Sequence, residues 1–388
     1  MQTVVTAERL WDGTSLHQHP FILIEDGKID SIASRESAEV PAGARVLDFP
    51  GATLGPPFFD VHIHGAAGHD VMEGTPEAID TMGRFLATRG TANYLATTVT
   101  ASLDATFRAL DGLANQIARL PQPGVARPLG IHLEGPFLSH EKRGVQPAEH
   151  LLAPSTATFD RLFDAARGHV RLMTLAPELP GAEELAKHAL ARGVRISMGH
   201  SNATAVETRR GIAAGAVSAT HTFNAMRPLD HREPGILGIV LTCDDLFAEL
   251  ICDGIHNEPE VVRLWWRAKG PERAILVTDA MSAAGMPDGE YQLGGFPVHV
   301  KDGRATAASA RGVLAGSVLT LDRALANFVR FTGATVEQAL RLLSSNPAAM
   351  TGLSHRAGSV APGKSANLVA VDDRGKLVAS IIGGQPAN

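Results

Sequence analysis

The sequence predicts a (β/α)8 barrel (TIM barrel) with a small β domain built from both ends of the chain. Eight apolar, β-branched runs recur in the middle of the chain, at 58–64, 92–99, 129–134, 170–178, 194–200, 218–224, 247–253 and 273–280. Helical patterns lie between most of these runs, and eight strands alternating with helices are typical of this barrel. A doubly wound open sheet is the alternative, but no glycine-rich dinucleotide motif follows the first run.

Both ends of the chain are rich in short β runs with tight turns. Asp26-Gly27 lies in the middle of residues 21–33 and is a strong hairpin signal. Residues 365–384 contain two β-rich runs around Asp373-Arg374-Gly375. We therefore expect residues 1–55 and 355–388 to form one small domain beside a barrel over 56–354. Two independent flaps are the alternative.

Helix starts are recognisable between the runs. Thr75 precedes Pro76, which places a capping residue before a proline at the first helical position. Thr204 and Glu207 have the spacing of a capping box, and Gly215 follows as a stop signal.

Composition excludes several classes of protein. Hydrophobic residues make up 44% and charged residues 20% of 388 residues, as in ordinary globular proteins. The net charge of −6 argues against a nucleic-acid partner, which would need a basic surface. The N-terminal segment lacks the apolar region of a signal peptide, and no apolar run is long enough to span a membrane. Cys243 and Cys252 cannot form a disulfide framework, so we expect a cytoplasmic protein.

Polar side chains gather where the predicted strands end. His62 and His64 are one residue apart and therefore project to the same side of an extended chain. Barrel active sites lie at the carboxyl ends of the strands, because the loops there share one mouth. Six of the eight runs end in metal ligands or proton carriers: His62 with His64, Glu134, His200, His221 with Asn224, Asp253 with His256, and Asp279. The pattern predicts a metal site.

Imidazole and carboxylate ligands without cysteine suit Zn²⁺, Fe²⁺, Co²⁺ or Mn²⁺, with zinc or iron the first expectation. Such an ion brings the pKa of bound water down to roughly 7. Asp279, at the end of the last strand, is the candidate to take a proton from this water and to hand it to a leaving amine.

Several segments together resemble the N-acetylglucosamine-6-phosphate deacetylases of the amidohydrolase superfamily. They are HLEGPFLSHEKRG, MGHSNAT, THTFNAMRPLDHREPG, DGIHNEP and LVTDAMSAAGMPDGEYQLGG, and GSVAPGKSANLVAVD resembles the usual end of that superfamily. The resemblance implies a distorted (β/α)8 barrel with a small β-sandwich domain built from both chain termini. It also implies hydrolysis of the acetamide of N-acetyl-D-glucosamine 6-phosphate by a metal-dependent homodimer. It implies that Glu134, His200 and His221 bind the metal and that Asp279 is catalytic.

The resemblance also implies a set of substrate-binding residues: Val145, Gln146, Asn224, Ala225, Asp253, His256, Leu314, Ala315 and Gly316. Arg232 matches an arginine that reaches the phosphate of the neighbouring subunit's substrate in this family, and an arginine fork suits phosphate oxygens. Gln146 departs from the family, which usually has a histidine there.

Three other functions are alternatives. Deacetylation of N-acetylgalactosamine 6-phosphate would keep the chemistry, and Gln146 is a position where the sugar could be selected. Cleavage of a cyclic amide, as in dihydroorotases, is disfavoured because LMTLAPE at the fourth strand end lacks their metal-bridging lysine. A sugar-phosphate-binding regulator on an inactive barrel would need neither Asp279 nor the ligand set.

The pair His62 and His64 is not needed for the first metal. Together with Asp279, and with Glu134 as a ligand shared by both ions, the two histidines predict a second metal site about 3.5–4 Å from the first. The alternative is that both histidines bind substrate or solvent beside a single metal.

Overall fold

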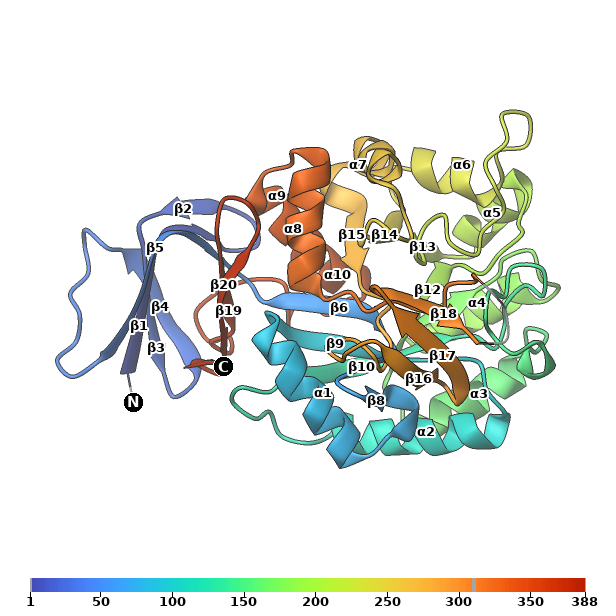
Figure 1. Cartoon of the computed structure of the whole chain (residues 1–388), viewed down its shortest axis with the longest axis horizontal. Helices are drawn as coiled ribbons and strands as arrows, with labels where there is room; N and C mark the ends of the chain where they lie inside the picture. The colour runs from blue at the N-terminus through green and yellow to red at the C-terminus, as the bar shows by residue number, and fades with distance from the viewer. Residues whose placement is uncertain (1, 309–311, 388) are drawn as a thin grey trace.

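The computed structural model describes residues 2–308 and 312–387. Eight parallel strands pair in chain order to form the barrel, as predicted (Figure 1). They are β6 (Phe58–Ile63), β9 (Thr91–Thr98), β10 (Arg127–Glu134), β11 (Val170–Leu175), β12 (Arg195–Met198), β13 (Ala216–Ala219), β14 (Phe247–Ile251) and β15 (Ala274–Val277). A parallel bridge between Ile63 and Ala280 brings the last strand back to the first.

Helices cover the outside of the barrel. They are α1 (Pro76–Thr88), α2 (Leu103–Ile117), α3 (Thr156–Ala165), α4 (Ala182–Ala191), α5 (Ala205–Ala213), α6 (Gly235–Thr242), α7 (Pro259–Arg273), α8 (Leu321–Thr332), α9 (Val336–Leu343) and α10 (Ser345–Met350). Because helices pack outside and side chains fill the inside, the barrel strands are buried on both faces. All six residues of β6 are buried, for example.

The predicted helix starts are confirmed. The side chain of Thr75 accepts a hydrogen bond from the backbone N–H of Ala78, and Pro76 opens α1. Thr204 and Glu207 form the reciprocal capping box at the start of α5. These caps satisfy N–H groups that have no partner within the helix.

The two ends of the chain share one eight-stranded sheet, which forms the second domain (Figure 1). Its strands are β1 (Gln2–Trp11), β2 (Leu16–Gln18), β3 (Pro20–Glu25), β4 (Lys28–Ser34), β5 (Arg45–Gly55), β19 (Leu368–Val371), β20 (Leu377–Ile382) and β21 (Gln385–Pro386). β5 pairs antiparallel with β19, so the ends do not form two separate flaps. Asp26 and Gly27, both with positive φ, make the predicted turn between β3 and β4. We propose domain boundaries near residues 56 and 354.

A three-stranded antiparallel sheet lies between β15 and α8 and was not predicted from the sequence. It consists of β16 (Gly289–Leu293), β17 (Phe296–Lys301) and β18 (Arg304–Ala307). Its buried face packs in one cluster with Val99 and Met281, which follow barrel strands, so the sheet stands at the mouth of the barrel (Figure 1). Smaller elements are β7 (Gly65–Ala66), β8 (His69–Asp70), η1 (Val71–Glu73) and η2 (Ala148–His150).

No helix in the described part of the chain is long and apolar enough to cross a membrane.

Candidate active site

Glu134, the last residue of β10, lies at the centre of the predicted metal site. Its Oε1 lies 3.1 Å from His221 Nε2, 3.2 Å from His200 Nε2 and 3.3 Å from His62 Nε2. The Nε2 atoms of His200 and His221 are themselves 3.2 Å apart. The four side chains come from four different strand ends and are all buried. The structure therefore brings together the groups that the sequence predicted as ligands.

The tautomers of the histidines fit a metal ion. His200 Nδ1 lies 2.9 Å from the carbonyl oxygen of Lys142, and His64 Nδ1 lies 2.9 Å from that of Thr97. A carbonyl can only accept, so each Nδ1 carries a proton, and Nε2 is the nitrogen that can ligate a metal. Nitrogen and carboxylate oxygen atoms converge here on one point, where a cation can lie between them. The donor set fits a divalent ion with nitrogen and oxygen ligands.

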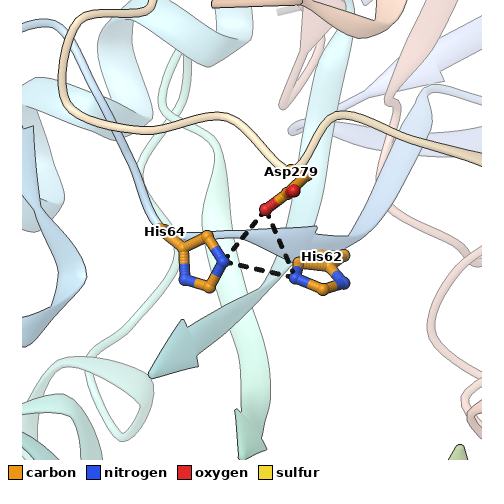
Figure 2. A group of neighbouring side chains, drawn as sticks. All are labelled: His62, His64 and Asp279. Carbon is orange, nitrogen blue, oxygen red and sulfur yellow. Dashed lines mark hydrogen bonds and ion pairs between the residues drawn. The ribbon is translucent and has the colours of Figure 1, made fainter. Parts of the chain in front are cut away.

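A second group is centred on His62 and His64 (Figure 2). Their Nε2 atoms are 3.2 Å apart, and Asp279 Oδ1 lies 3.1 Å from His64 Nε2 and 3.5 Å from His62 Nε2. Figure 2 shows the three polar ends pointing toward one another: His62 comes from β6, His64 directly follows this strand, and Asp279 lies in the segment after β15. His64 Nε2 also lies 3.4 Å from Glu134 Oε2, so Glu134 faces both groups.

Charged side chains at the site shift one another's pKa. Burial alone would raise the pKa of Asp279, but the hydrogen bond with His64 and the charge of His62 outweigh it and lower this pKa to about 2. Burial lowers the pKa of His62, yet the carboxylate of Glu134 raises it well above its ordinary value. The carboxylates are therefore ionised, and their field favours a cation among the imidazoles.

Four residues of the site have a positive φ, which is uncommon for residues other than glycine: His200 (45°), His221 (27°), Ala225 (52°) and Asp279 (50°). Hydrogen bonds hold this backbone in place. Asp279 N donates to His62 O at 2.9 Å, and Asp279 O accepts from Ser317 N at 2.7 Å. Such strain persists only where the surroundings enforce it, and it concentrates at functional sites.

Close packing explains why a glycine, Gly65, follows His64. A Cβ on Gly65 would lie 2.4 Å from His69 O and 2.8 Å from Ser282 N. Only glycine lets the chain turn here directly after His64.

Glu249, inside β14, is a member of the site that the sequence analysis missed. Its Oε2 lies 3.4 Å from His62 Nδ1 and accepts a hydrogen bond from His221 N at 3.3 Å. Carboxylates that hold the far nitrogen of a ligating histidine orient the ring. A fully buried acid within the apolar run FAELI was the available signal.

His132, two residues before Glu134, is by contrast a structural histidine. Its ring nitrogens bond Val61 O at 3.0 Å and Thr174 Oγ1 at 2.8 Å. Burial lowers its pKa well below the ordinary value, so the ring is neutral and has no nitrogen left for a metal.

A cavity of about 340 Å³ opens over the site. It is lined by the predicted Glu134, His200, His221, His64, Asp279, Val145, Gln146, Asn224, Ala225, His256, Leu314 and Gly316, together with Val99, Gly144, Leu293, Gly312 and Val313. This volume suits a small molecule rather than a polymer. Leu293 belongs to β16, so the unpredicted sheet contributes one wall.

Gln146 lines the cavity, but both polar atoms of its amide are engaged. Nε2 donates to Glu134 Oε2 at 2.7 Å, and Oε1 accepts from Thr100 N at 2.8 Å. The side chain is buried and fixes Glu134.

Three predicted substrate-binding residues do not line the cavity. Asp253 lies behind His256, whose Nδ1 is 2.7 Å from Asp253 Oδ2. Ala315 is fully buried, and its N–H donates to Ala305 O of β18 at 3.0 Å. Arg232 is exposed on the loop between β13 and α6, and its backbone N–H donates to Asp230 Oδ1 at 2.8 Å.

Comparison with known proteins gives consistent matches. The model of the amidohydrolase family matches residues 53–388. The N-acetylglucosamine-6-phosphate deacetylase of Lysinibacillus sphaericus is 37% identical over 94% of this chain and 92% of its own length. The N-acetylgalactosamine-6-phosphate deacetylase of Escherichia coli is 39% identical over 90% of this chain and 93% of its own length.

Solved structures agree with these matches. A mutant N-acetyl-D-glucosamine-6-phosphate deacetylase from Mycobacterium smegmatis, in complex with N-acetyl-D-glucosamine-6-phosphate, superposes with a TM-score of 0.91 at 33% identity. The superposition covers 100% of this chain and 99% of that chain. Since the family match spans the barrel and both ligand groups, the chain belongs to the metal-dependent amidohydrolase family.

Proposed function

We propose that this enzyme hydrolyses the acetamide of N-acetyl-D-glucosamine 6-phosphate to D-glucosamine 6-phosphate and acetate. The observation that carries the proposal is the convergence of Glu134, His200, His221 and Asp279 on one cavity of sugar size. The relatives and the superposed structure named above support the substrate class.

The residues divide into two ligand groups. Glu134, His200 and His221 would hold a first divalent ion, zinc or iron, and His62, His64 and Asp279 a second. A bound ion supplies a polarised acetamide carbonyl and a water whose pKa is brought down to roughly 7.

Asp279 is the proton carrier in this proposal. Its carboxylate lines the cavity and is ionised, since its pKa lies at about 2. It can accept the proton of the attacking water and then pass it to the amine that leaves when the C–N bond breaks. The backbone bonds to His62 and Ser317 hold it in position for both transfers.

His256, which also lines the cavity, positions the substrate. Asp253 accepts the hydrogen bond from its Nδ1, which leaves Nε2 for the acetamide carbonyl or a sugar hydroxyl. Burial raises the pKa of Asp253, but its bond to His256 outweighs this and lowers it. Asp253 therefore acts through His256 rather than by contact with the sugar.

The phosphate needs a cation that one chain does not supply at the cavity. No lysine or arginine is among the described residues that line it. We infer that Arg232 of a second copy reaches the phosphate, in a homodimer. Its exposure and its freedom from ion pairs within the described part of the chain support this.

Deacetylation of N-acetylgalactosamine 6-phosphate is the second candidate, favoured by the relative in Escherichia coli. The bonds of Gln146 argue that its amide serves Glu134 and does not choose between the sugars. We further place the enzyme in the cytoplasm, because Cys243 and Cys252 are both free thiols.

A substrate panel tests the proposal. Metal-loaded enzyme is assayed for acetate release from N-acetylglucosamine and N-acetylgalactosamine, each with and without the 6-phosphate. We expect the highest kcat/KM for N-acetylglucosamine 6-phosphate, and Gln146→His should leave the ratio between the two phosphorylated sugars unchanged. Binding of the phosphorylated sugar without acetate release would favour a regulator instead.

A further inference from the structure

A second pocket, lined by basic residues, lies at the opposite end of the barrel from the candidate active site. Arg195 begins β12 and Arg171 is the second residue of β11, so both stand where strands enter the barrel. The segment after α10 adds Arg356 and His355. Together these four residues, which we call the basal pocket, line a cavity of about 430 Å³ with Leu190, Gly193, Val194, Thr351, Gly352 and Leu353.

The charges of the basal pocket are not compensated. None of the described residues that line it is acidic. Within the described chain, Arg171, Arg195 and Arg356 form no salt bridge, whereas exposed arginines elsewhere, such as Arg167, do. Arg171 donates only to the carbonyls of Gly168 and Val170, at 3.0 and 3.3 Å.

The guanidinium groups of Arg171 and Arg356 lie close enough to act on each other. Burial lowers the pKa of Arg171, and the charge of Arg356 lowers it further. The same two causes lower the pKa of Arg127, which begins β10. Arg195 reaches the turn at Gly352, with Nη2 3.5 Å from the place that a Cβ of Gly352 would take. Like charges gathered in this way cost stability unless an anion joins them.

A neighbouring cavity of about 460 Å³ extends the basic surface. It shares His355 and Arg356 with the basal pocket and adds Arg127, Lys28 and Lys364, with Asp26 as the acidic residue among its described lining. A ligand that places an anionic group in the basal pocket therefore has room for an uncharged part beside it.

We propose that the basal pocket binds a phosphorylated small molecule, whose phosphate is held by Arg171, Arg195 and Arg356. Guanidinium groups match phosphate oxygens with paired N–H donors, and several arginines without carboxylate partners are the usual composition of such a site. The volume is that of a small-molecule pocket. A nucleic acid is disfavoured by the net charge of −6. The site is separate from the proposed deacetylase chemistry and does not depend on it.

Binding stoichiometry tests the proposal. Glucose 6-phosphate is the probe, because it carries the phosphate but has no acetamide to hydrolyse. Calorimetric titration of the metal-loaded full chain should show one saturable site more in the wild type than in Arg195→Gln/Arg356→Gln. Arg45→Gln/Arg108→Gln is the control, because it removes two exposed arginines elsewhere and should keep the wild-type stoichiometry.

The comparison is independent of the active site. If the active site also binds the probe, the number of saturable sites falls from two in the wild type to one in the double variant. If the active site does not bind it, the number falls from one to zero. Equal stoichiometry in the wild type and the double variant would overturn the proposal. So would a titration heat that depends only on ionic strength and not on the probe.

Two further measurements separate binding from a structural role. Without probe, the double variant should have a Tm equal to or above that of the wild type, because repulsion is relieved; arginines that merely support the fold would lower Tm when replaced. Should the double variant not fold, Arg356→Gln alone replaces one exposed side chain and should weaken the extra site about tenfold, as expected for the loss of a charged hydrogen bond. Unchanged affinity in that variant would also overturn the proposal.

Discussion

Gln146 donates a hydrogen bond from its amide to Oε2 of Glu134 at 2.7 Å, while Thr100 N holds the other end of the amide at 2.8 Å. The Oε2 atom of this carboxylate is thereby fixed, and Oε1 faces His200 and His221. Glutamine at this position thus acts on the metal site, although the sequence suggested a role in sugar selection.

Gln146→Ala should weaken metal retention. Partners behind metal ligands typically contribute about 10- to 100-fold in metal affinity. Dialysis against graded chelator, followed by metal analysis, measures the loss. Gln18→Ala removes an exposed glutamine of β2 and should have no effect. Equal retention in the two variants would show that the bond to Glu134 does not matter.

Asp279→Asn should keep the fold and the first metal ion but remove the proton carrier. General acid–base groups contribute about 10²- to 10⁴-fold, and we expect a loss of kcat at the upper end of this range. Steady-state assays on variant enzyme with verified metal content provide the check. A rate within threefold of the wild type, about 0.6 kcal/mol, contradicts the assignment.

Arg232→Ala should raise KM for the phosphorylated sugar and leave any activity on the unphosphorylated sugar nearly unchanged. The phosphate contact is made equally in the ground state and the transition state, so its loss appears in KM. Arg45→Ala, an exposed arginine of β5, is the control.

Mixing subunits tests whether Arg232 acts across a dimer. Arg232→Ala and Asp279→Asn proteins are each impaired, but a heterodimer of the two contains one complete site. Activity should recover after subunit exchange. If mixing restores nothing, the site is not shared between subunits.

His62→Asn/His64→Asn should lose one equivalent of metal and retain the other. Glu134, His200 and His221 keep their mutual contacts without the pair, whereas Asp279 loses both imidazoles. Metal analysis after loading decides this, with His19→Asn/His299→Asn as the surface control. Unchanged stoichiometry would mean that the pair serves substrate or solvent beside a single ion.

The sequence by itself determined the barrel and most of the site. Strands buried on both faces need continuous apolar runs, so all eight could be located, and the polar residues that end them mark the mouth. Caps such as Thr204 with Glu207 could be read because their partners are three residues apart. Glu134, His200 and His221 were predicted as ligands in the same way, since each lies at the end of a barrel strand or within two residues after it.

Only the tertiary structure decided which side chains meet. Glu249 lies 187 residues from His62 along the chain, and no periodicity encodes that contact. The engagement of Gln146 with Glu134 and the position of Asp253 behind His256 depend on side-chain directions in loops, which local sequence does not specify. The basal pocket likewise arises because the starts of β11 and β12 and the segment after α10 converge only in the closed barrel, where their positive charges are brought together.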